Sequence, residues 1–142
     1  MRAPLPLPPE NLRIRVGPFS DAELFARSGE EMSADIVHLC DLPASARTLE
    51  IGCGCGRLSR AFAAYLSPEG TYEGFDVAGP LIDWCKQLLE PQLPNFHFSF
   101  VDVHAGAHNP RGVVKAAAFR FPFPDRSFVR CYSILGFHAC GT

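Results

Sequence analysis

Apolar positions along the chain alternate between strand-like runs and helix-like spacing. The segment "RTLEIG" at residues 47–52 is a short apolar strand, and "TYEGFDV" at residues 71–77 is predicted to be a second strand that ends at Asp76. The segment "NFHFSFVDV" at residues 95–103 alternates phenylalanines with polar neighbours. This pattern predicts a third strand that ends near Asp102.

Helical spacing occupies the stretches between and before these runs. Apolar residues recur at i, i+3, i+4 and i+7 over residues 57–66, and a similar pattern follows a Gly-Pro pair over residues 79–90. An earlier helix is predicted over residues 28–40, where Ser28 and Glu31 have the spacing of a capping box. Each predicted strand after the first therefore follows a predicted helix.

The order of these elements predicts the fold class. Strand, helix, strand, helix and strand in short succession are typical of an α/β fold with a parallel, right-handed, Rossmann-like sheet and flanking helices. A length of 142 residues suits one compact domain. The proline-rich segment over residues 1–20 is predicted to be an extended N-terminal arm that precedes this domain.

The composition of the chain indicates which partners it is expected to bind and in which cellular compartment it is expected to lie. A net charge of −2 gives no general attraction to nucleic acid or to an anionic membrane, and no apolar run is long enough to span a bilayer. The N-terminus lacks the apolar core of a secretory signal, so we expect a cytoplasmic protein with reduced cysteines. Cys53 and Cys55 lack a second ligand pair at zinc spacing, which favours buried filler residues and no metal site.

The densest chemical signal is the glycine-rich bend in "TLEIGCGCGRLSRAF". Glycines at Gly52, Gly54 and Gly56 let the backbone turn sharply between a strand and a helix and let a ligand approach closely. A dinucleotide fingerprint needs a third glycine where this chain has Arg57 or Ser59. The Lys-Ser/Thr pair of a phosphate-binding P-loop is also absent.

Acidic residues stand at the ends of all three predicted strands. Glu50 lies in the first strand just before the glycine bend, Asp76 ends the second, and Asp102 ends the third. Ligands of parallel α/β sheets bind at the carboxyl ends of the strands. The glycine bend and the acids are therefore predicted to form one ligand site.

The pattern E-x-G-x-G-x-G resembles motif I of class I S-adenosylmethionine-dependent methyltransferases. The resemblance implies that the glycine bend lies along the methionine part of S-adenosyl-L-methionine and that Glu50 orients the surrounding network. It also implies that Asp76 accepts hydrogen bonds from both ribose hydroxyls and that Val77 packs on the adenine. Asp102 matches the family acid near the adenine amino group, with Val103 beside it.

The resemblance extends over about residues 8–128 and includes "PPENLRIRVG", "YEGFDVAGPLIDWC" and "FRFPFPDRSF". It implies that residues 21–142 form the N-terminal, cofactor-binding part of a methyltransferase fold. The function implied is methyl transfer to an unidentified acceptor, expected to be a small molecule. The sequence identifies no catalytic residue. His104 and His108 follow the third strand, where a base would be useful, although a solvated loop is the simpler interpretation.

Two other functions stay open from the residues. The first is a non-catalytic module that binds the cofactor or a related nucleoside and acts through a partner. The second is a nicotinamide-dependent oxidoreductase, which the missing third glycine of the fingerprint disfavours. The sequence does not determine an oligomeric state.

The C-terminal stretch "VRCYSILGFHACGT" departs from the family pattern, which continues with an aspartate and an apolar strand. Arg130 is a poor fit for a strand buried on both faces. Reading any DNA that encodes residues 128–140 one base later permits residues that match the pattern, so we hypothesise a frameshifted or fragmentary product. Such a chain is expected to be marginally stable and inactive by itself. Resequencing of the locus tests this hypothesis.

Overall fold

The computed structural model describes residues 3–133 and contains a four-stranded sheet with the order β3-β2-β1-β4. All three neighbouring strand pairs are parallel. The strands are β1 (Arg47–Ile51), β2 (Thr71–Asp76), β3 (Phe96–Phe100) and β4 (Arg130–Ser133). The predicted Rossmann-like α/β class is confirmed, and β3 ends two residues before the predicted position at Asp102.

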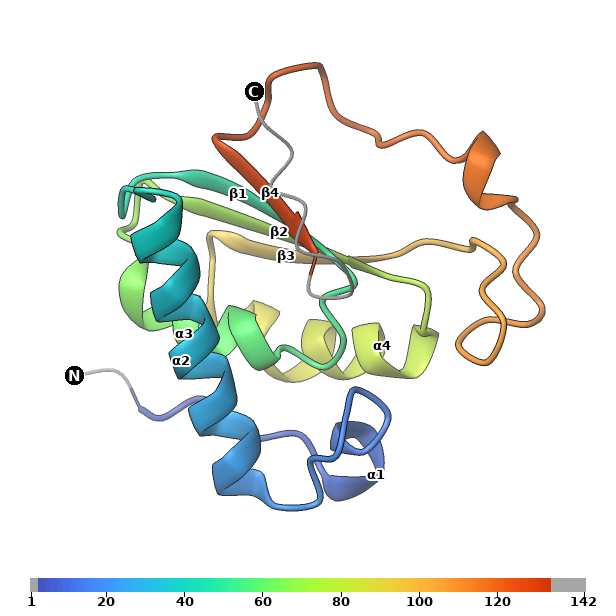
Figure 1. Cartoon of the computed structure of the whole chain (residues 1–142), viewed down its shortest axis with the longest axis horizontal. Helices are drawn as coiled ribbons and strands as arrows, with labels where there is room; N and C mark the ends of the chain where they lie inside the picture. Colours follow the sequence, from blue (N-terminus) through green and yellow to red (C-terminus); the bar gives the residue numbers. More distant parts are fainter. Residues whose placement is uncertain (1–2, 134–142) are drawn as a thin grey trace.

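Four α-helices accompany the sheet. They are α1 (Glu10–Arg13), α2 (Ala22–Leu39), α3 (Arg57–Tyr65) and α4 (Gly79–Leu88), with short 3₁₀ helices η1 (Glu90–Gln92) and η2 (Ala116–Ala118). The helices α2, α3 and α4 lie on one side of the sheet, and the long segment between β3 and β4 curves around its other side (Figure 1). None of the helices in the described part of the chain combines the length and the apolar character needed to cross a bilayer.

The main core lies between the sheet and these three helices. Tyr72 of β2 stacks on Phe96 of β3 with ring centroids 5.0 Å apart, and Phe98 and Phe62 pack around the same tyrosine. All four side chains are at most 2% exposed. Burial of this many aromatic rings supplies the main hydrophobic contribution to folding.

The helix α2 is longer than the sequence predicted. It begins at Ala22, and the side chain of Asp21 caps it by accepting a hydrogen bond from the Leu24 N–H at 2.6 Å. The capping box predicted at Ser28 is wrong, because Ser28 lies inside the helix and its hydroxyl donates to the Phe25 carbonyl. Asp21 has the same capping chemistry about two turns earlier, and packing of Phe25 in a second core cluster extends the helix to it.

The N-terminal segment is not extended throughout, because Glu10–Arg13 form the short helix α1. Arg13 is only 8% exposed, and its guanidinium donates to the carbonyls of Pro8, Phe19 and Ser20. Arg60 of α3 donates to the carbonyls of two further N-terminal residues, Leu5 and Pro6. These backbone contacts hold the segment against the domain despite its many prolines.

The strand β4 pairs with β1 at one edge of the sheet, and the unfavourable fit predicted for Arg130 is not observed. Arg130 is half-buried, and its guanidinium donates two hydrogen bonds, at 2.8 and 3.2 Å, to the carbonyl of Cys40 at the end of α2. An edge position and a helix C-terminus both accommodate a cation. Residues 134–142, which include most of the altered tail, lie outside the described residues.

Candidate functional site

The glycine bend follows β1 and opens α3. Gly52, Gly54 and Gly56 have φ angles of +81°, +57° and +86°, which are left-handed conformations that side chains disfavour. A Cβ atom at Gly56 would lie 2.6 Å from Leu89, and one at Gly54 would lie 2.8 Å from Val16. The alternation of glycines therefore reflects both the backbone conformation and close packing on α4 and on the N-terminal segment.

Asp76 ends β2 and faces this bend. One oxygen of its carboxylate accepts the Gly54 N–H and the other accepts the Ala78 N–H, both at 2.8 Å. Asp76 thereby joins the bend after β1 to the turn before α4. Each carboxylate oxygen has a second lone pair, so the side chain can still accept hydrogen bonds from two ligand hydroxyls.

Glu50, in β1 two residues before Gly52, has no exposed surface. One oxygen accepts a hydrogen bond from the Tyr72 hydroxyl at 2.5 Å, and the other, Oε1, has no hydrogen-bond partner among the described residues. Burial raises the pKa of Glu50 from 4.5 to about 8, against the opposing effects of Tyr72 and Arg57. The buried acid is thus held largely protonated at neutral pH.

A cavity of about 430 Å³ lies at the carboxyl end of the sheet, which is within the size range of small-molecule sites. Its wall includes five of the residues predicted for the cofactor: Gly52, Gly54, Asp76, Val77 and Val103. Most of the remaining wall is apolar, so a ligand held there is shielded from water on several sides.

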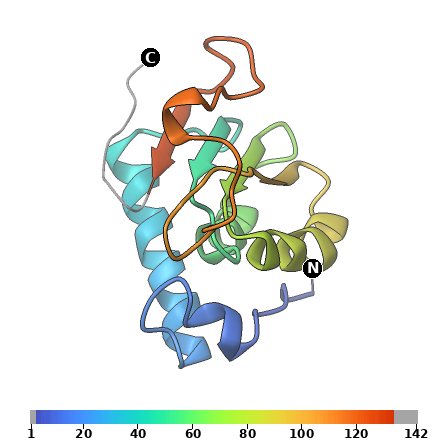
Figure 2. The ribbon, with the colours of Figure 1, turned by 90° about the vertical axis from the view of Figure 1, so that its right-hand side faces the viewer.

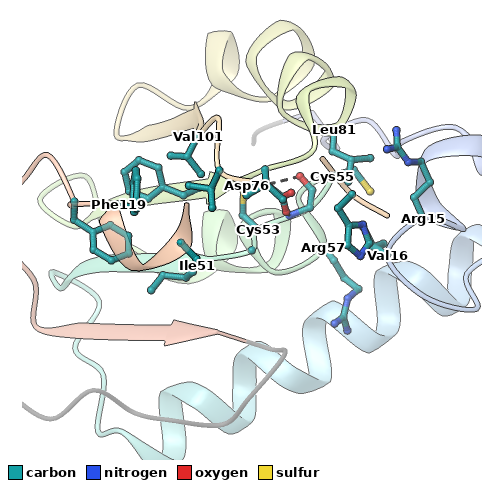
Figure 3. Close-up of a pocket in the computed structure, with 18 residues that line it drawn as sticks. Arg15, Val16, Ile51, Cys53, Cys55, Arg57, Asp76, Leu81, Val101 and Phe119 are labelled. Atoms are coloured by element: carbon teal, nitrogen blue, oxygen red, sulfur yellow. Dashed lines mark hydrogen bonds between the residues drawn. The ribbon is translucent and has the colours of Figure 1, made fainter. Parts of the chain in front are cut away.

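The two ends of the cavity differ in chemistry, and Asp76 lies between them (Figure 3). The apolar end contains Ile51, Val101 and Phe119. Arg57, at the other end, extends toward α2, where its guanidinium donates to the Ser28 hydroxyl at 3.3 Å and lies 5.1 Å from the ring centre of Phe19. Neither Arg57 nor the neighbouring Arg15 forms an ion pair within residues 3–133.

The cysteines near the bend are buried, as the sequence predicted for Cys53 and Cys55. They are 3% and 0% exposed, and burial raises the pKa of the Cys55 thiol to about 12. The thiols of Cys53 and Cys85 both point to the Gly54 carbonyl, with sulfur–oxygen distances of 3.9 and 3.6 Å. Within the described residues, no three His, Cys, Asp or Glu side chains are grouped so that they could hold a metal ion.

Two predicted site residues, besides the buried Glu50, do not contribute to the cavity wall. Gly56 lies behind the bend, packed against α4. Asp102 follows β3 at the same edge of the sheet, but its carboxylate accepts a hydrogen bond from the Asn109 side chain at 3.1 Å. The structure therefore brings the glycine bend, Asp76, Val77 and Val103 together and leaves Asp102 outside this group.

A family model described as "Methyltransferase domain" matches residues 49–141, which is more than half of the chain. The chain belongs to this methyltransferase family. The match includes the glycine bend, Asp76 and Asp102 of the site. It also continues through the C-terminal stretch in which we expected the family pattern to be lost, so the frameshift stays a hypothesis for resequencing to test.

Two solved structures share the architecture of this methyltransferase domain, and a third has a weaker likeness to it. The YcgJ protein from Bacillus subtilis is 20% identical with a TM-score of 0.50, and the match covers 72% of this chain and 37% of that chain. The cyclase SpnF is 18% identical with a TM-score of 0.51, covering 72% of this chain and 32% of that chain. A cyclopropane-fatty-acyl-phospholipid synthase-like protein from Lactobacillus casei is 27% identical with a TM-score of 0.48, and the match covers 59% of this chain and 34% of that chain. The chain thus spans about a third of the length of these proteins.

Sequence reasoning missed several residues that line the cavity of the methyltransferase domain. Arg15 and Val16 come from the N-terminal segment, and Phe119 and Phe121 come from the segment before β4. No local pattern marks them, because their place in the wall depends on contacts with segments far away in the chain. Only the apolar character of the two phenylalanines is visible in the sequence.

Proposed function

We propose that this chain binds S-adenosyl-L-methionine and forms the cofactor-binding half of an enzyme that methylates a small-molecule acceptor. The observation that carries this proposal is the position of Asp76. Its half-buried carboxylate faces a bend made of glycines, inside a cavity large enough for a nucleoside. This combination supplies acceptors for a ribose diol next to a surface without side chains.

The residues present fit the cofactor part by part. The two free lone pairs on the Asp76 carboxylate suit the two ribose hydroxyls. Val77 and Val103 give the cavity an apolar surface for a purine base. Gly52 and Gly54 leave the backbone open to the amino-acid part, and the first turn of α3 beside them adds a partial positive charge suited to a carboxylate.

Glu50 provides a second test of this fit. An unpartnered, buried carboxyl oxygen is costly, and a bound group, an ordered water or a catalytic role are the usual reasons for one. Oε1 belongs to the side chain two residues before Gly52, within electrostatic reach of Arg57 and Asp76. We infer that Glu50 orients the polar groups around the amino-acid part of the cofactor.

The chemistry that the bound cofactor supplies is a methyl group on a sulfonium centre, which needs little further activation. The contribution of this chain is therefore to bind, to orient and to exclude water, and proximity provides much of the rate. The apolar end of the cavity, with Ile51, Val101 and Phe119, excludes water from the site. Because the chain spans about a third of its matched structures, the acceptor site is proposed to need residues outside the described part.

The experiment is a calorimetric titration of the chain with S-adenosylmethionine, S-adenosylhomocysteine and NAD. We expect both adenosyl compounds to bind and NAD not to bind. Asp76→Asn is expected to weaken adenosyl binding about tenfold or more, because one acceptor oxygen is replaced by an amide donor. Asp83→Asn, an exposed acid on α4, is the matched control and is expected to bind like the unmodified chain.

A folded chain that binds neither adenosyl compound would contradict the proposal, and so would equal binding by Asp76→Asn. Assays of methyl transfer over a panel of small acceptors then separate an enzyme from a non-catalytic binding module. Binding without turnover in a version extended to the length of its relatives favours the module.

A further inference from the structure

The third acid of the predicted site is already engaged within the chain. The side-chain amide of Asn109 donates to the Asp102 carboxylate at 3.1 Å and to the Val103 carbonyl at 3.0 Å. Asp102 does not line the cavity, whereas its neighbour Val103 does. The carboxylate keeps further lone pairs, but because Asp102 does not line the cavity, it is not placed for the polar contact to a purine base that the family resemblance assigned to it.

The loop that holds Asn109 is an ordered wall of the site. Ala105 and Asn109 exchange backbone hydrogen bonds of 3.1 and 2.8 Å, and the His104 N–H donates to the Val114 carbonyl at 2.8 Å. A Cβ atom at Gly112 would lie 2.5 Å from the His104 nitrogen, so this position requires glycine for the loop to close. Figure 2 shows the loop crossing in front of the carboxyl ends of the strands.

His108 is the polar side chain that this loop contributes to the cavity wall. It directly precedes Asn109, whose side-chain amide donates to the Val103 carbonyl, so the loop that carries His108 is tied to the segment that contributes Val103 to the wall. The side chain is exposed and forms no hydrogen bond with other described residues. His104, on the same loop, is also exposed but does not line the cavity.

The other polar groups of the cavity wall are unsuited to recognising a purine amino group. Arg15 and Arg57 have only donors, and Asp76 is placed for the ribose and already accepts two backbone N–H groups. Burial raises the pKa of the Cys53 and Cys55 thiols, so both stay protonated and are weak acceptors. A neutral imidazole offers a ring nitrogen as an acceptor and a flat face for packing.

We propose that His108, in place of Asp102, contacts the adenine of the bound cofactor and accepts a hydrogen bond from its amino group. This inference rests on the proposed function, because it concerns the same bound nucleoside. It makes His108 a binding residue and gives Asp102 the structural task of holding Asn109 and the loop.

The test is a titration with two nucleosides, S-adenosylhomocysteine and S-inosylhomocysteine. The second compound carries an oxygen in place of the adenine amino group. The unmodified chain is expected to prefer the adenine compound about tenfold. His108→Ala should lose that preference by weakening S-adenosylhomocysteine binding about tenfold. His104→Ala, the matched control on the same loop, should retain both the affinity and the preference.

The outcomes separate this inference from the proposed function. Suppose that the unmodified chain binds S-adenosylhomocysteine, that Asp76→Asn loses this binding and that His108→Ala keeps it. The inference is then overturned and the proposed function stands. A loss of the adenine preference in Asp102→Asn with His108→Ala unaffected also overturns it. If the folded chain binds no adenosyl compound at all, the proposed function itself fails.

Discussion

The two faces of the sheet are built differently. On the face covered by α2, α3 and α4, aromatic side chains of β2 and β3 form a closed core in which Tyr72, Phe96 and Phe98 are at most 2% exposed. On the opposite face, the cover is the segment before β4, and its Phe121 and Phe123 meet Phe75 of β2 edge to face. Phe121 is still 43% exposed.

This difference separates stability from ligand binding. The helix-covered face buries most of the apolar side chains that stabilise the fold, and Cys85 of α4 contacts the Gly54 carbonyl of the glycine bend. The aromatic segment on the opposite face buries less surface, yet it supplies Phe119 and Phe121 to the apolar end of the cavity. Substitutions on the two faces should therefore affect different measurements.

The largest expected difference comes from truncating one phenylalanine on each face. Phe62→Ala removes a fully buried ring and should lower the free energy of unfolding by about 3–5 kcal/mol. Phe121→Ala removes a partly exposed ring and should cost less than about 1.5 kcal/mol. Chemical denaturation followed by circular dichroism measures both. Equal losses in the two variants would show that the aromatic segment is as much a part of the core as α3.

The next largest effect is a pH dependence of stability that arises from Glu50, which is buried on the helix-covered face. Burial raises the pKa of Glu50 from 4.5 to about 8, so the folded chain binds this proton more tightly than the unfolded chain does. The free energy of unfolding should therefore fall as pH rises between about 4.5 and 8, by up to about 1.4 kcal/mol per pH unit from this group. Glu50→Gln should remove that slope.

The measurement for Glu50 is denaturation of both forms at several pH values in this window. The difference between Glu50→Gln and the unmodified chain should grow in favour of the variant as pH rises. Glu23→Gln, an exposed acid on α2, is the control and should leave the slope unchanged. A parallel pH dependence of Glu50→Gln and the unmodified chain would contradict a buried, protonated Glu50.

The smallest effect concerns the edge strand β4, where the Arg130 side chain contacts the end of α2. Arg130→Met removes both hydrogen bonds to the Cys40 carbonyl and should lower the free energy of unfolding by about 1 kcal/mol. Arg111→Met, on an exposed loop, should change it by less than about 0.5 kcal/mol. If the two variants are equally stable, the contact between Arg130 and α2 contributes nothing measurable to stability.

The sequence was most informative where local chemistry and tertiary structure agree. The strand-like segments at β1 and β2 and the spacing of α3 and α4 predicted these elements close to their observed bounds, because burial against a sheet imposes those periods. The glycine bend was equally clear, since only glycine tolerates its backbone angles. Prediction failed at the start of α2, where Asp21 and Ser28 offer the same local capping chemistry and packing of Phe25 decides between them.

The sequence likewise predicted some features of the candidate site and not others. Glu50, Asp76 and Asp102 were identified because each stands at a strand end. The sequence could not show that Asn109 holds the Asp102 carboxylate or that His108 and not His104 lines the cavity. These outcomes depend on how one loop closes.

The sequence by itself determined the parallel α/β class, the glycine bend and the alignment of acids along one edge of the sheet. These features follow from periodicity, from the backbone freedom of glycine and from the rule that parallel strands end at a common edge. Only the tertiary structure decided which acid faces the bend, which arginines are held by backbone carbonyls and which segments complete the cavity. Such contacts join residues far apart in the chain. Their geometry depends on how whole helices and strands pack, and a short stretch of sequence does not determine that packing.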